Sequence, residues 1–433
     1  MHGGSPVVGE SIFEQGFGTG LAGDPNGRPL ERTDIRDLGE QTDLVKLGLA
    51  GNLRDFEFTG SDGVVKSGTE VDYNDSAAGY ADQPDEVINY VDAHDNETLY
   101  DLGVLKLPVD LPMADRVRMN TLSLATVTLS QSPSFWHAGT ELLRSKSLDR
   151  NSYNSGDWFN RIDWTGQEST FGSGLPNEAD NGDNWDIMTP LLENPALKPG
   201  AADIAAAEAS ALDLLRVRNE VDLLQLGSAA LIDEKVTFPN SGADATPGLI
   251  VMQIDDLVGA DVDAALDGAL VVFNASPDAI TEQVDGLAGR EFALTDAQAN
   301  GSDAVVKTTG WDAATGTLTV PARSVAVLVD EQEPPAVSTS VVAVPSKVLA
   351  KAGSAVKLTG QVAAADGTEP VGTVTIMDGD QAIATTQVSA GDQGRLSVKL
   401  PKLGAGVHVL TVAFDGAEGY ADSSSVPIGI VLW

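Results

Sequence analysis

The sequence predicts an α/β region followed by two all-β regions. Val87–Val91 is a short apolar run, mostly β-branched or aromatic, which is typical of a strand buried in a parallel sheet. Met113–Leu129 then spaces its apolar side chains as a helix does, and Ser134–Gly139 offers another short strand. Strand, helix and strand in this order form the repeating unit of a parallel barrel. From about Ala229 the pattern changes to short strands separated by Asp, Gly and Pro loops.

Composition excludes several classes of function. The 433 residues carry 64 acidic and 26 basic side chains, a formal charge of −38, which argues against nucleic acid and anionic membranes as partners. The absence of cysteine excludes disulfides and thiolate catalysis, and four histidines disfavour a multi-histidine metal site. No apolar run approaches the roughly 20 residues of a membrane span, and Met1–Gln15 shows no signal-peptide pattern.

A polar cluster follows the first predicted strand directly. His94, Asp95 and Asn96 stand at its C-terminal end, where barrel and open α/β enzymes place their chemistry. The same three residues could instead form a loop that caps the next helix, because Asp and Asn favour caps and turns. Spacing alone leaves both interpretations open.

The stretch Tyr-Val-Asp-Ala-His-Asp-Asn-Glu-Thr-Leu-Tyr-Asp at residues 90–101 closely resembles the fourth signature region of the α-amylase clan of glycoside hydrolases, in the form seen in type I pullulanases. This resemblance implies a fold class of α/β plus all-β, in which residues 1–228 are the C-terminal portion of a (β/α)8 barrel. It also implies that Asp95 stabilises the transition state and that His94 assists it. The pair would grip the 2- and 3-hydroxyls of a sugar.

The loop Thr140–Trp164 is dense in polar and aromatic side chains. Without a family in view it could be a solvated loop or a sugar groove. Residues 141–160 resemble the pullulanase loop after the last barrel strand, which implies that the loop lines the cleft. On that resemblance the substrate-binding candidates, together with Asn96, are Arg150, Asn151, Asp157 and Trp158. Several pullulanases carry Asp at the positions of Asn151 and Asn154.

A retaining glycosidase needs a carboxylate nucleophile and a second carboxylic acid, about 5 Å apart. Arg32-Thr-Asp34 and Arg161-Ile-Asp163 have the Arg-x-Asp form of the family's nucleophile, but neither follows a buried strand. Glu141 lies in the loop after the last strand and is a poor candidate for the acid. The sequence therefore predicts a chain that begins within the barrel and lacks both the nucleophile and the acid.

The remaining N-terminal half adds weaker expectations. Met1–Gly39 is expected to be mostly irregular, with a flexible loop at Gly16–Gly20, and Asp43–Arg54 holds a short strand or helix. Ala201–Leu215 is predicted to be a helix that buries Ile204, Ala211, Leu212 and Leu215 on one face. Asp180–Asp186 lacks the spacing of a calcium loop. We therefore expect no metal site and no cofactor, and a calcium requirement of a longer parent enzyme stays open.

Two β-sandwiches are expected after residue 228. Residues 229–331 resemble the C-terminal domain of pullulanase-type enzymes, and Glu331–Ser338 is a Pro-bearing linker. Residues 339–433 have the regular short strands of an immunoglobulin-like sandwich and resemble bacterial Ig-like repeats of secreted and cell-surface enzymes. His408 lies in one of these strands and is expected to be a packing or edge residue.

Three functional hypotheses follow. In the first, the chain is part of a starch-debranching hydrolase that cleaves α-1,6 linkages in pullulan, limit dextrins or glycogen. In the second, it is a non-catalytic α-glucan-binding or surface-display protein. In the third, another chain supplies the missing half of a split enzyme. All three share an α-glucan partner, and the resemblance implies an extracellular or cell-surface location, with possible attachment through the Ig-like domain.

Overall fold

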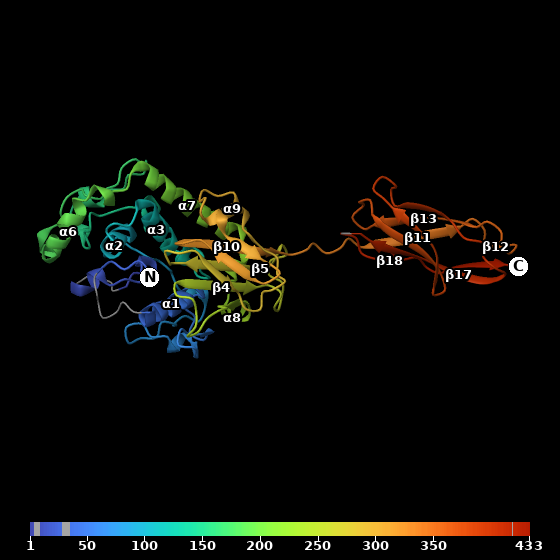
Figure 1. Ribbon diagram of the computed structural model, residues 1–433, viewed down its shortest axis with the longest axis horizontal. Helices are drawn as coiled ribbons and strands as arrows, with labels where there is room; N and C mark the ends of the chain where they lie inside the picture. The colour runs from blue at the N-terminus through green and yellow to red at the C-terminus, as the bar shows by residue number, and fades with distance from the viewer. Residues whose placement is uncertain (4–8, 28–34, 418) are drawn as a thin grey trace. The chain divides into compact units, whose positions relative to one another are not determined.

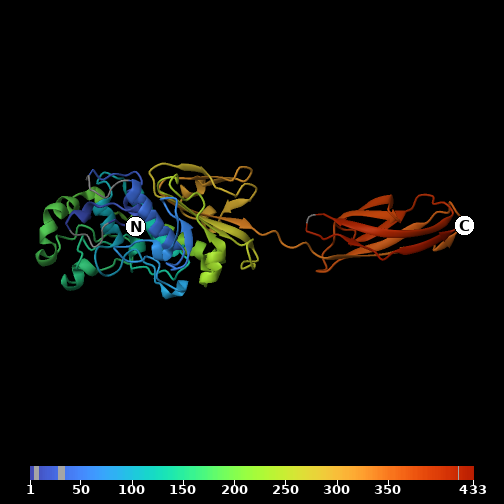
Figure 2. The ribbon, with the colours of Figure 1, turned by 90° about the horizontal axis from the view of Figure 1, so that it is seen from below.

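The computed structural model describes residues 1–3, 9–27, 35–417 and 419–433, so Arg32-Thr-Asp34 lies outside the described residues. The chain forms two compact units, Met1–Gln332 and Glu333–Trp433, each with its own hydrophobic core (Figure 1). The same division is seen in the view from below in Figure 2. Each unit is described by itself.

The two helices predicted with the clearest patterns are present. The helix α3 spans Met113–Thr128 and α7 spans Ala201–Glu220, and they pack against each other. Ile204 and Ala211 are buried on α7 as predicted, but Leu212 and Leu215 are exposed, and Leu214 and Val217 take their place in the core. The prediction for the two leucines was wrong because the buried stripe continues through 207, 211, 214 and 217.

The segment Asp43–Arg54 is largely helical, because α1 extends over Ile35–Leu49 and ends just before a turn at Gly51. The glycine cluster at Gly16–Gly20 was wrongly expected to be a flexible loop: its central residues, including Phe17, are buried. The other α-helices of the first unit are α2 (Leu99–Lys106), α4 (Asp157–Asn160), α5 (Glu178–Asn181), α6 (Trp185–Leu192), α8 (Ala229–Lys235) and α9 (Asp296–Ala299).

The strands predicted at Val87–Val91 and Ser134–Gly139 are reduced to a single parallel bridge between Asn89 and Ser134. The Asn89 N–H donates to the Pro133 carbonyl, and the Phe135 N–H donates to the Asn89 carbonyl. Val87 and Val91 are buried, whereas Ile88 and Tyr90 are 63% and 59% exposed, so the predicted burial on both faces was wrong. Because side chains of an extended segment alternate between its faces, only one face of this segment has packing partners among the described residues of the first unit.

A β-sandwich closes the first unit. Its larger sheet has the order β3-β4-β5-β10-β7 and its smaller sheet the order β6-β9-β8. The central strands β4, β5 and β10 are buried on both faces because the small sheet covers one face, and α1 and α3 contact the other (Figure 1). These strands are β3 (Val236–Thr237), β4 (Leu249–Asp255), β5 (Leu266–Asn274), β6 (Ile280–Gln283), β7 (Phe292–Leu294), β8 (Gly310–Asp312), β9 (Thr317–Val320) and β10 (Ser324–Glu331). A small hairpin pairs β1 (Glu57–Thr59) with β2 (Val65–Ser67).

The second unit is an antiparallel sandwich, as the alternating pattern predicts. One sheet has the order β11-β13-β16, and the other has the order β12-β19-β17-β14-β15, with β18 paired to β17. The core comes from alternate positions such as Val374, Ile376, Val412 and Phe414. The strands are β11 (Thr339–Pro345), β12 (Leu349–Ala350), β13 (Lys357–Ala364), β14 (Gly372–Asp378), β15 (Gln381–Val388), β16 (Arg395–Lys399), β17 (Gly406–Gly416), β18 (Ser423–Ser424) and β19 (Ile428–Leu432).

His408 lies on β17 and pairs with Ile430 of β19, two residues beyond Leu410, where the pairing of β17 with β14 ends, so it has a strand neighbour on one side only, in agreement with the expected edge position. Its Nδ1 lies 2.5 Å from Asp378 Oδ2. Among the residues described in both units, no helix is both long enough and apolar enough to cross a membrane.

Candidate functional site

The loop after Val91 presents the two predicted sugar-gripping side chains to solvent. His94 and Asp95 side chains are 86% and 81% exposed, and His94 Nε2 lies 3.6 Å from Asp95 Oδ1. Asn96 follows with a left-handed backbone, φ 61°, which Asn tolerates better than most residues. This sharp turn reverses the chain before α2, so His94 and Asp95 stand at the tip of the loop.

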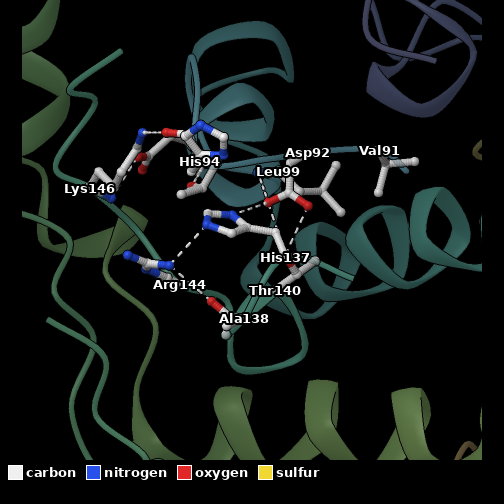
Figure 3. Close-up of polar contacts among 12 residues, drawn as sticks. Val91, Asp92, His94, Leu99, His137, Ala138, Thr140, Arg144 and Lys146 are labelled. Carbon is white, nitrogen blue, oxygen red and sulfur yellow. Dashed lines mark hydrogen bonds and ion pairs between the residues drawn. The ribbon is translucent and has the colours of Figure 1, made fainter. Parts of the chain in front are cut away.

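Lys146 holds the backbone of this tip. Its Nζ donates to the carbonyl oxygens of His94 at 3.1 Å and Asn96 at 2.6 Å. The lysine is almost wholly buried, and burial lowers the pKa of its ammonium group, while Asp101 opposes that shift. Figure 3 shows Lys146 reaching the His94 end of the loop from the neighbouring segment. The position of His94 and Asp95 therefore depends on a lysine from the loop Thr140–Trp164.

A buried aspartate ties the two loops together below the tip. Asp92 accepts hydrogen bonds from Thr140 Oγ1 at 2.9 Å and from the Leu99 N–H at 3.1 Å. Its Oδ2 also lies 3.3 Å from His137 Nδ1 (Figure 3). Because a buried carboxylate is costly unless donors surround it, these contacts fix the relative positions of the segments that hold them.

Arg144 determines which tautomer of His137 is compatible with this cluster. Its Nη1 lies 3.0 Å from His137 Nε2 and also donates to the Ala138 carbonyl. A guanidinium only donates, so His137 Nε2 accepts and Nδ1 carries the proton that points to Asp92. Arg144 Nη2 continues the chain of contacts to the Asn160 carbonyl at the end of α4. Asp92, His137 and Arg144 thus connect the His94 loop to α4.

Asp101 provides a second anchor at the first turn of α2. It accepts from Ser145 Oγ at 2.5 Å and from the Lys146 N–H at 2.8 Å. Burial raises the pKa of this carboxyl group, and the hydrogen bonds oppose that shift. Thr98 caps the same helix by accepting from the Asp101 N–H. The start of α2 and the backbone of Lys146 are therefore held as one body.

The loop with the predicted substrate contacts is partly ordered by its own polar groups. Buried Asp149 accepts from the Asn151 N–H at 3.0 Å and from Ser155 Oγ at 2.6 Å. Trp158 is 57% exposed, donates from Nε1 to the Ser173 carbonyl and lies under the Arg161 guanidinium. Asp157 is exposed at the start of α4. An indole with one open face and adjacent carboxylate and guanidinium groups suits a sugar ring.

Glu97 and Arg150 lie near each other at the base of the His94 loop. Burial raises the pKa of Glu97 to about 7, and the charge of Arg150 opposes this shift. Glu97 Oε2 and Arg150 Nε are both buried without a hydrogen-bond partner among the described residues. Arg150 therefore lies at the junction of the two loops, half-buried.

The structure brings the predicted residues together in two groups. His94, Asp95 and Asn96 form the tip, Arg150 lies at its base, and Asp157 and Trp158 stand on the α4 side of the Arg144 contacts. Sequence reasoning assigned no role to Asp92, His137, Arg144 or Lys146, which position the site. Arg144 and Lys146 were visible only as members of a polar loop, and no spacing marked Asp92 or His137 as partners.

Two further observations concern a cavity and metal ions. A cavity of about 370 Å³ lies between α3, α7 and β10, and its lining contains none of the predicted site residues. Among the described residues, no group of three or more His, Asp or Glu side chains is arranged to hold a metal ion.

Comparison with known proteins identifies both units. Residues 166–331 match the family of α-1,6-glucosidases, pullulanase-type, C-terminal, and residues 341–431 match the bacterial Ig-like domain, group 3. Pullulanase 1, chloroplastic, of Arabidopsis thaliana is 40% identical over 338 residues, which cover 76% of this chain and 35% of that protein. The pullulanase of Klebsiella pneumoniae is 40% identical over 333 residues, 76% of this chain and 30% of that protein.

Solved pullulanase structures are also similar to this chain. The maltotriose complex of PulA from Klebsiella pneumoniae superposes with a TM-score of 0.72 at 40% identity, over 76% of this chain and 36% of that one. PulA from Klebsiella oxytoca gives 0.71 at 39% identity, over 76% and 31%. The chain spans about a third of the length of these relatives.

The fold and these matches first define a region similar to the C-terminal part of a glucosidase, followed by a region similar to a bacterial Ig-like domain. More particularly, residues 166–331 match the C-terminal family of pullulanase-type α-1,6-glucosidases, and 76% of the chain is similar to pullulanases at 40% identity.

Proposed function

We propose that this chain is the substrate-holding C-terminal part of a starch-debranching hydrolase, which cleaves α-1,6 linkages in pullulan, limit dextrins or glycogen with retention of configuration. The observation that carries the proposal is the Lys146 contact, because it joins the His94–Asp95 tip to the loop of Arg150, Asn151, Asp157 and Trp158. The maltotriose complex of the 40% identical PulA supports an α-glucan as the ligand.

The proposed chemistry of the tip is transition-state stabilisation. As the glycosidic bond breaks, positive charge develops on the sugar ring, and hydrogen bonds from the 2- and 3-hydroxyls to Asp95 strengthen. His94 donates to a neighbouring oxygen and orients the ring. Both side chains are exposed to solvent, so a ligand can reach them. The nucleophile and the acid belong to the part of a pullulanase that this chain does not match.

The exposed face of the Val87–Val91 segment supports the proposal that this region is part of a (β/α)8 barrel. Ile88, Tyr90 and Phe135 are all more than half exposed on the bridged segments. In a barrel, such inward-pointing side chains are covered by the side chains of other strands. An apolar face of this kind is unusual on a free surface and is explained if further strands pack against it.

A chimera tests the catalytic proposal. Residues 1–332 would replace the corresponding segment of the Klebsiella pneumoniae pullulanase, and pullulan hydrolysis would be measured. We expect the chimera to be active and Asp95→Asn to lower kcat at least about 100-fold, with little change in KM. Asp244→Asn, at an exposed carboxylate in the sandwich, is the matched control. Pullulan hydrolysis by the 433-residue chain alone would contradict the predicted absence of the two carboxylates.

A second candidate function is a non-catalytic α-glucan-binding or surface-display protein, attached to a cell surface through the Ig-like unit. It is favoured by the match of residues 341–431 to a bacterial Ig-like domain. Calorimetry of the intact chain with maltotriose distinguishes the two functions. Micromolar binding that Trp158→Ala weakens would favour the binding protein, whereas activity that appears only in the chimera would favour the enzyme part. We propose an extracellular or cell-surface location in both cases.

A further inference from the structure

One end of the Ig-like unit concentrates basic charge. All lysines of this unit lie close to three points that meet at this end: the end of β11, the start of β13 and the end of β16. The register pairs Lys357 with Lys399, and the Ala352 N–H donates to the carbonyl of Trp433. The Gly353 N–H donates to the Leu403 carbonyl, which brings the neighbours Lys351 and Lys402 to the same end. We call this surface the lysine end; its lysines are Lys347, Lys351, Lys357, Lys399 and Lys402.

These lysines are exposed, and among the described residues none of them forms an ion pair with a carboxylate. Most acidic residues of the unit lie at its other end, where the linker enters. There the Ala365 N–H donates to the Ser338 carbonyl beside Asp366, and Glu369 accepts from the Gly391 N–H. Asp378 and Asp380 are exceptions: they flank the turn between β14 and β15, and the pairing of Asp378 with Leu410 places them toward the lysine end, at the opposite edge of the sheet from β12. Most of the acidic charge is therefore separated from the lysines along the unit, and these two carboxylates are separated from β12 across the sheet.

Exposed apolar side chains adjoin the lysine end. The register places Leu349, Val431 and Val407 side by side across β12, β19 and β17, and they are 61%, 40% and 73% exposed. Trp433 follows two residues after Val431 and is also mostly exposed. The Trp433 N–H donates to the Ala350 carbonyl, so the indole is tied to the same three strands. Figure 1 shows β12 and the C-terminus of the chain together at this end of the unit.

We propose that the lysine end and the adjoining row of Leu349, Val431, Val407 and Trp433 dock on the surface of a bilayer that contains anionic phospholipids. Lysines attract phosphate headgroups, and Trp is the side chain that favours the boundary between headgroups and acyl chains. A soluble polyanion would use the lysines but would leave the apolar row in water. Lys347 and Lys351 stand two positions on either side of Leu349 and so adjoin the apolar row, whereas Lys357 and Lys399 point outward from the other sheet of the sandwich. The combination of lysines and apolar side chains at the β12 edge favours the lipid.

The charge of −38 for the whole chain does not oppose this docking. Residues 333–433 contain nine acidic and six basic residues, so nearly all of the negative charge belongs to the first unit. Screening reduces electrostatic interactions over about 8 Å at physiological ionic strength, so the local lysines determine the attraction at the docking surface. Whole-chain charge, which the sequence analysis used against anionic membranes, averages over two units of very different character.

Co-sedimentation of the intact chain with vesicles tests the proposal. Equimolar phosphatidylglycerol and phosphatidylcholine vesicles should bind the chain, and pure phosphatidylcholine vesicles should bind it at least about tenfold more weakly. Each lysine at the surface contributes about a fivefold change in affinity, so the triple variant Lys347→Gln, Lys351→Gln, Lys402→Gln should lose roughly 100-fold. Arg395→Gln, an exposed basic residue at the linker end of the same unit, is the matched control and should bind unchanged.

A second variant separates the apolar contribution. Trp433→Ala should weaken vesicle binding severalfold and leave its salt dependence unchanged, because no charge is altered. The melting transition of the Ig-like unit reports whether each variant folds. The inference rests on the attachment role proposed above for this unit. If the intact chain bound polyphosphate or lipid-free cell-wall fragments but not anionic vesicles, the attachment role would stand and the proposed lipid partner would be wrong. If the triple variant bound anionic vesicles as well as the unaltered chain does, the proposed docking surface would be wrong.

Discussion

The two units of this chain bury very different kinds of side chain. In the second unit, among residues 333–417 and 419–433, none of the ionisable side chains is buried, and the core is built from aliphatic residues and Phe414. The first unit buries ionisable side chains throughout: Asp24, Asp43, Lys46, Asp92, Glu97, Asp101, Lys106, Arg116, His137, Lys146, Asp149, Asp213, Lys235, Asp256 and Asp330.

This difference teaches where irregular backbone needs polar support. The sandwich of the second unit satisfies its backbone through sheet pairing, so apolar contacts suffice for its core. The loops around His94 and Arg150 have no such pairing, and buried carboxylates, Arg144 and Lys146 satisfy their backbone groups instead. The loops of the candidate site are therefore held in place by buried charged side chains. Removal of any one of these side chains should disturb the loop that it supports.

The largest effect is expected at the Lys235–Asp256 ion pair of the first unit. The two groups lie 2.8 Å apart and both are almost fully buried. Lys235→Met leaves Asp256 buried without its counter-ion and should lower the free energy of unfolding of the first unit by about 3–5 kcal/mol. Calorimetry should show the transition of the first unit move to lower temperature and that of the second unit stay in place.

The exposed Lys307→Met is the control and should change neither transition. The double variant Lys235→Met, Asp256→Leu removes both charges and should recover much of the loss. A double variant as unstable as the single one would contradict the contrast between the two units.

Glu97 should make the stability of the first unit depend on pH. Burial raises the pKa of its carboxyl group to about 7 from an ordinary 4.5. Between these values the folded state binds more protons than the unfolded state, so stability is greatest below pH 4.5 for this group and falls as the pH rises towards 7, by about 3 kcal/mol. Urea unfolding of Glu97→Gln, compared with the unaltered chain across this range, should show the slope reduced. An equal slope in the variant and in the unaltered chain would contradict this role of Glu97.

A smaller effect separates the two faces of the Val87–Val91 segment. Val87→Ala removes buried methyl groups and should cost about 2 kcal/mol, whereas Ile88→Ala at its exposed neighbour should stay within about 0.5 kcal/mol. Urea unfolding of the first unit measures both. Equal losses would mean that Ile88 is covered in solution.

The smallest effect is expected in the second unit, at His408. Its hydrogen bond to Asp378 raises the pKa of the imidazole. A raised pKa contributes stability that is fully present below the ordinary value of 6.5 and is lost as the pH rises through the folded value. His408→Ala should therefore lower the melting temperature of the second unit slightly at pH 5 and not at pH 9. A change of equal size at both values would assign the effect to packing.

The sequence predicted the parts of the fold in which one periodicity dominates. The helices α3 and α7 and the alternating strands of the second unit follow from local pattern because a packed face requires it. The prediction failed for Val87–Val91, where an apolar run was interpreted as buried on both faces. Ile88 and Tyr90 are exposed because no described residue covers that face, and an apolar run does not encode which of its faces will be covered.

The candidate site divides in the same way. His94, Asp95 and the Arg150–Trp158 loop were found through the family motif, and their roles stay predictions. The supporting residues were not found, because Asp92 meets His137 across 45 positions and Lys146 meets His94 across 52. Contacts of such separation are created by the fold, and single polar residues carry no periodic signal that would reveal them.

One ammonium group, that of Lys146, holds the carbonyls on both sides of Asp95. The tip and the loop that carries Lys146 are therefore ordered together. On the proposed function, a glucan that orders one of them would also order the other, so the two share one entropic cost.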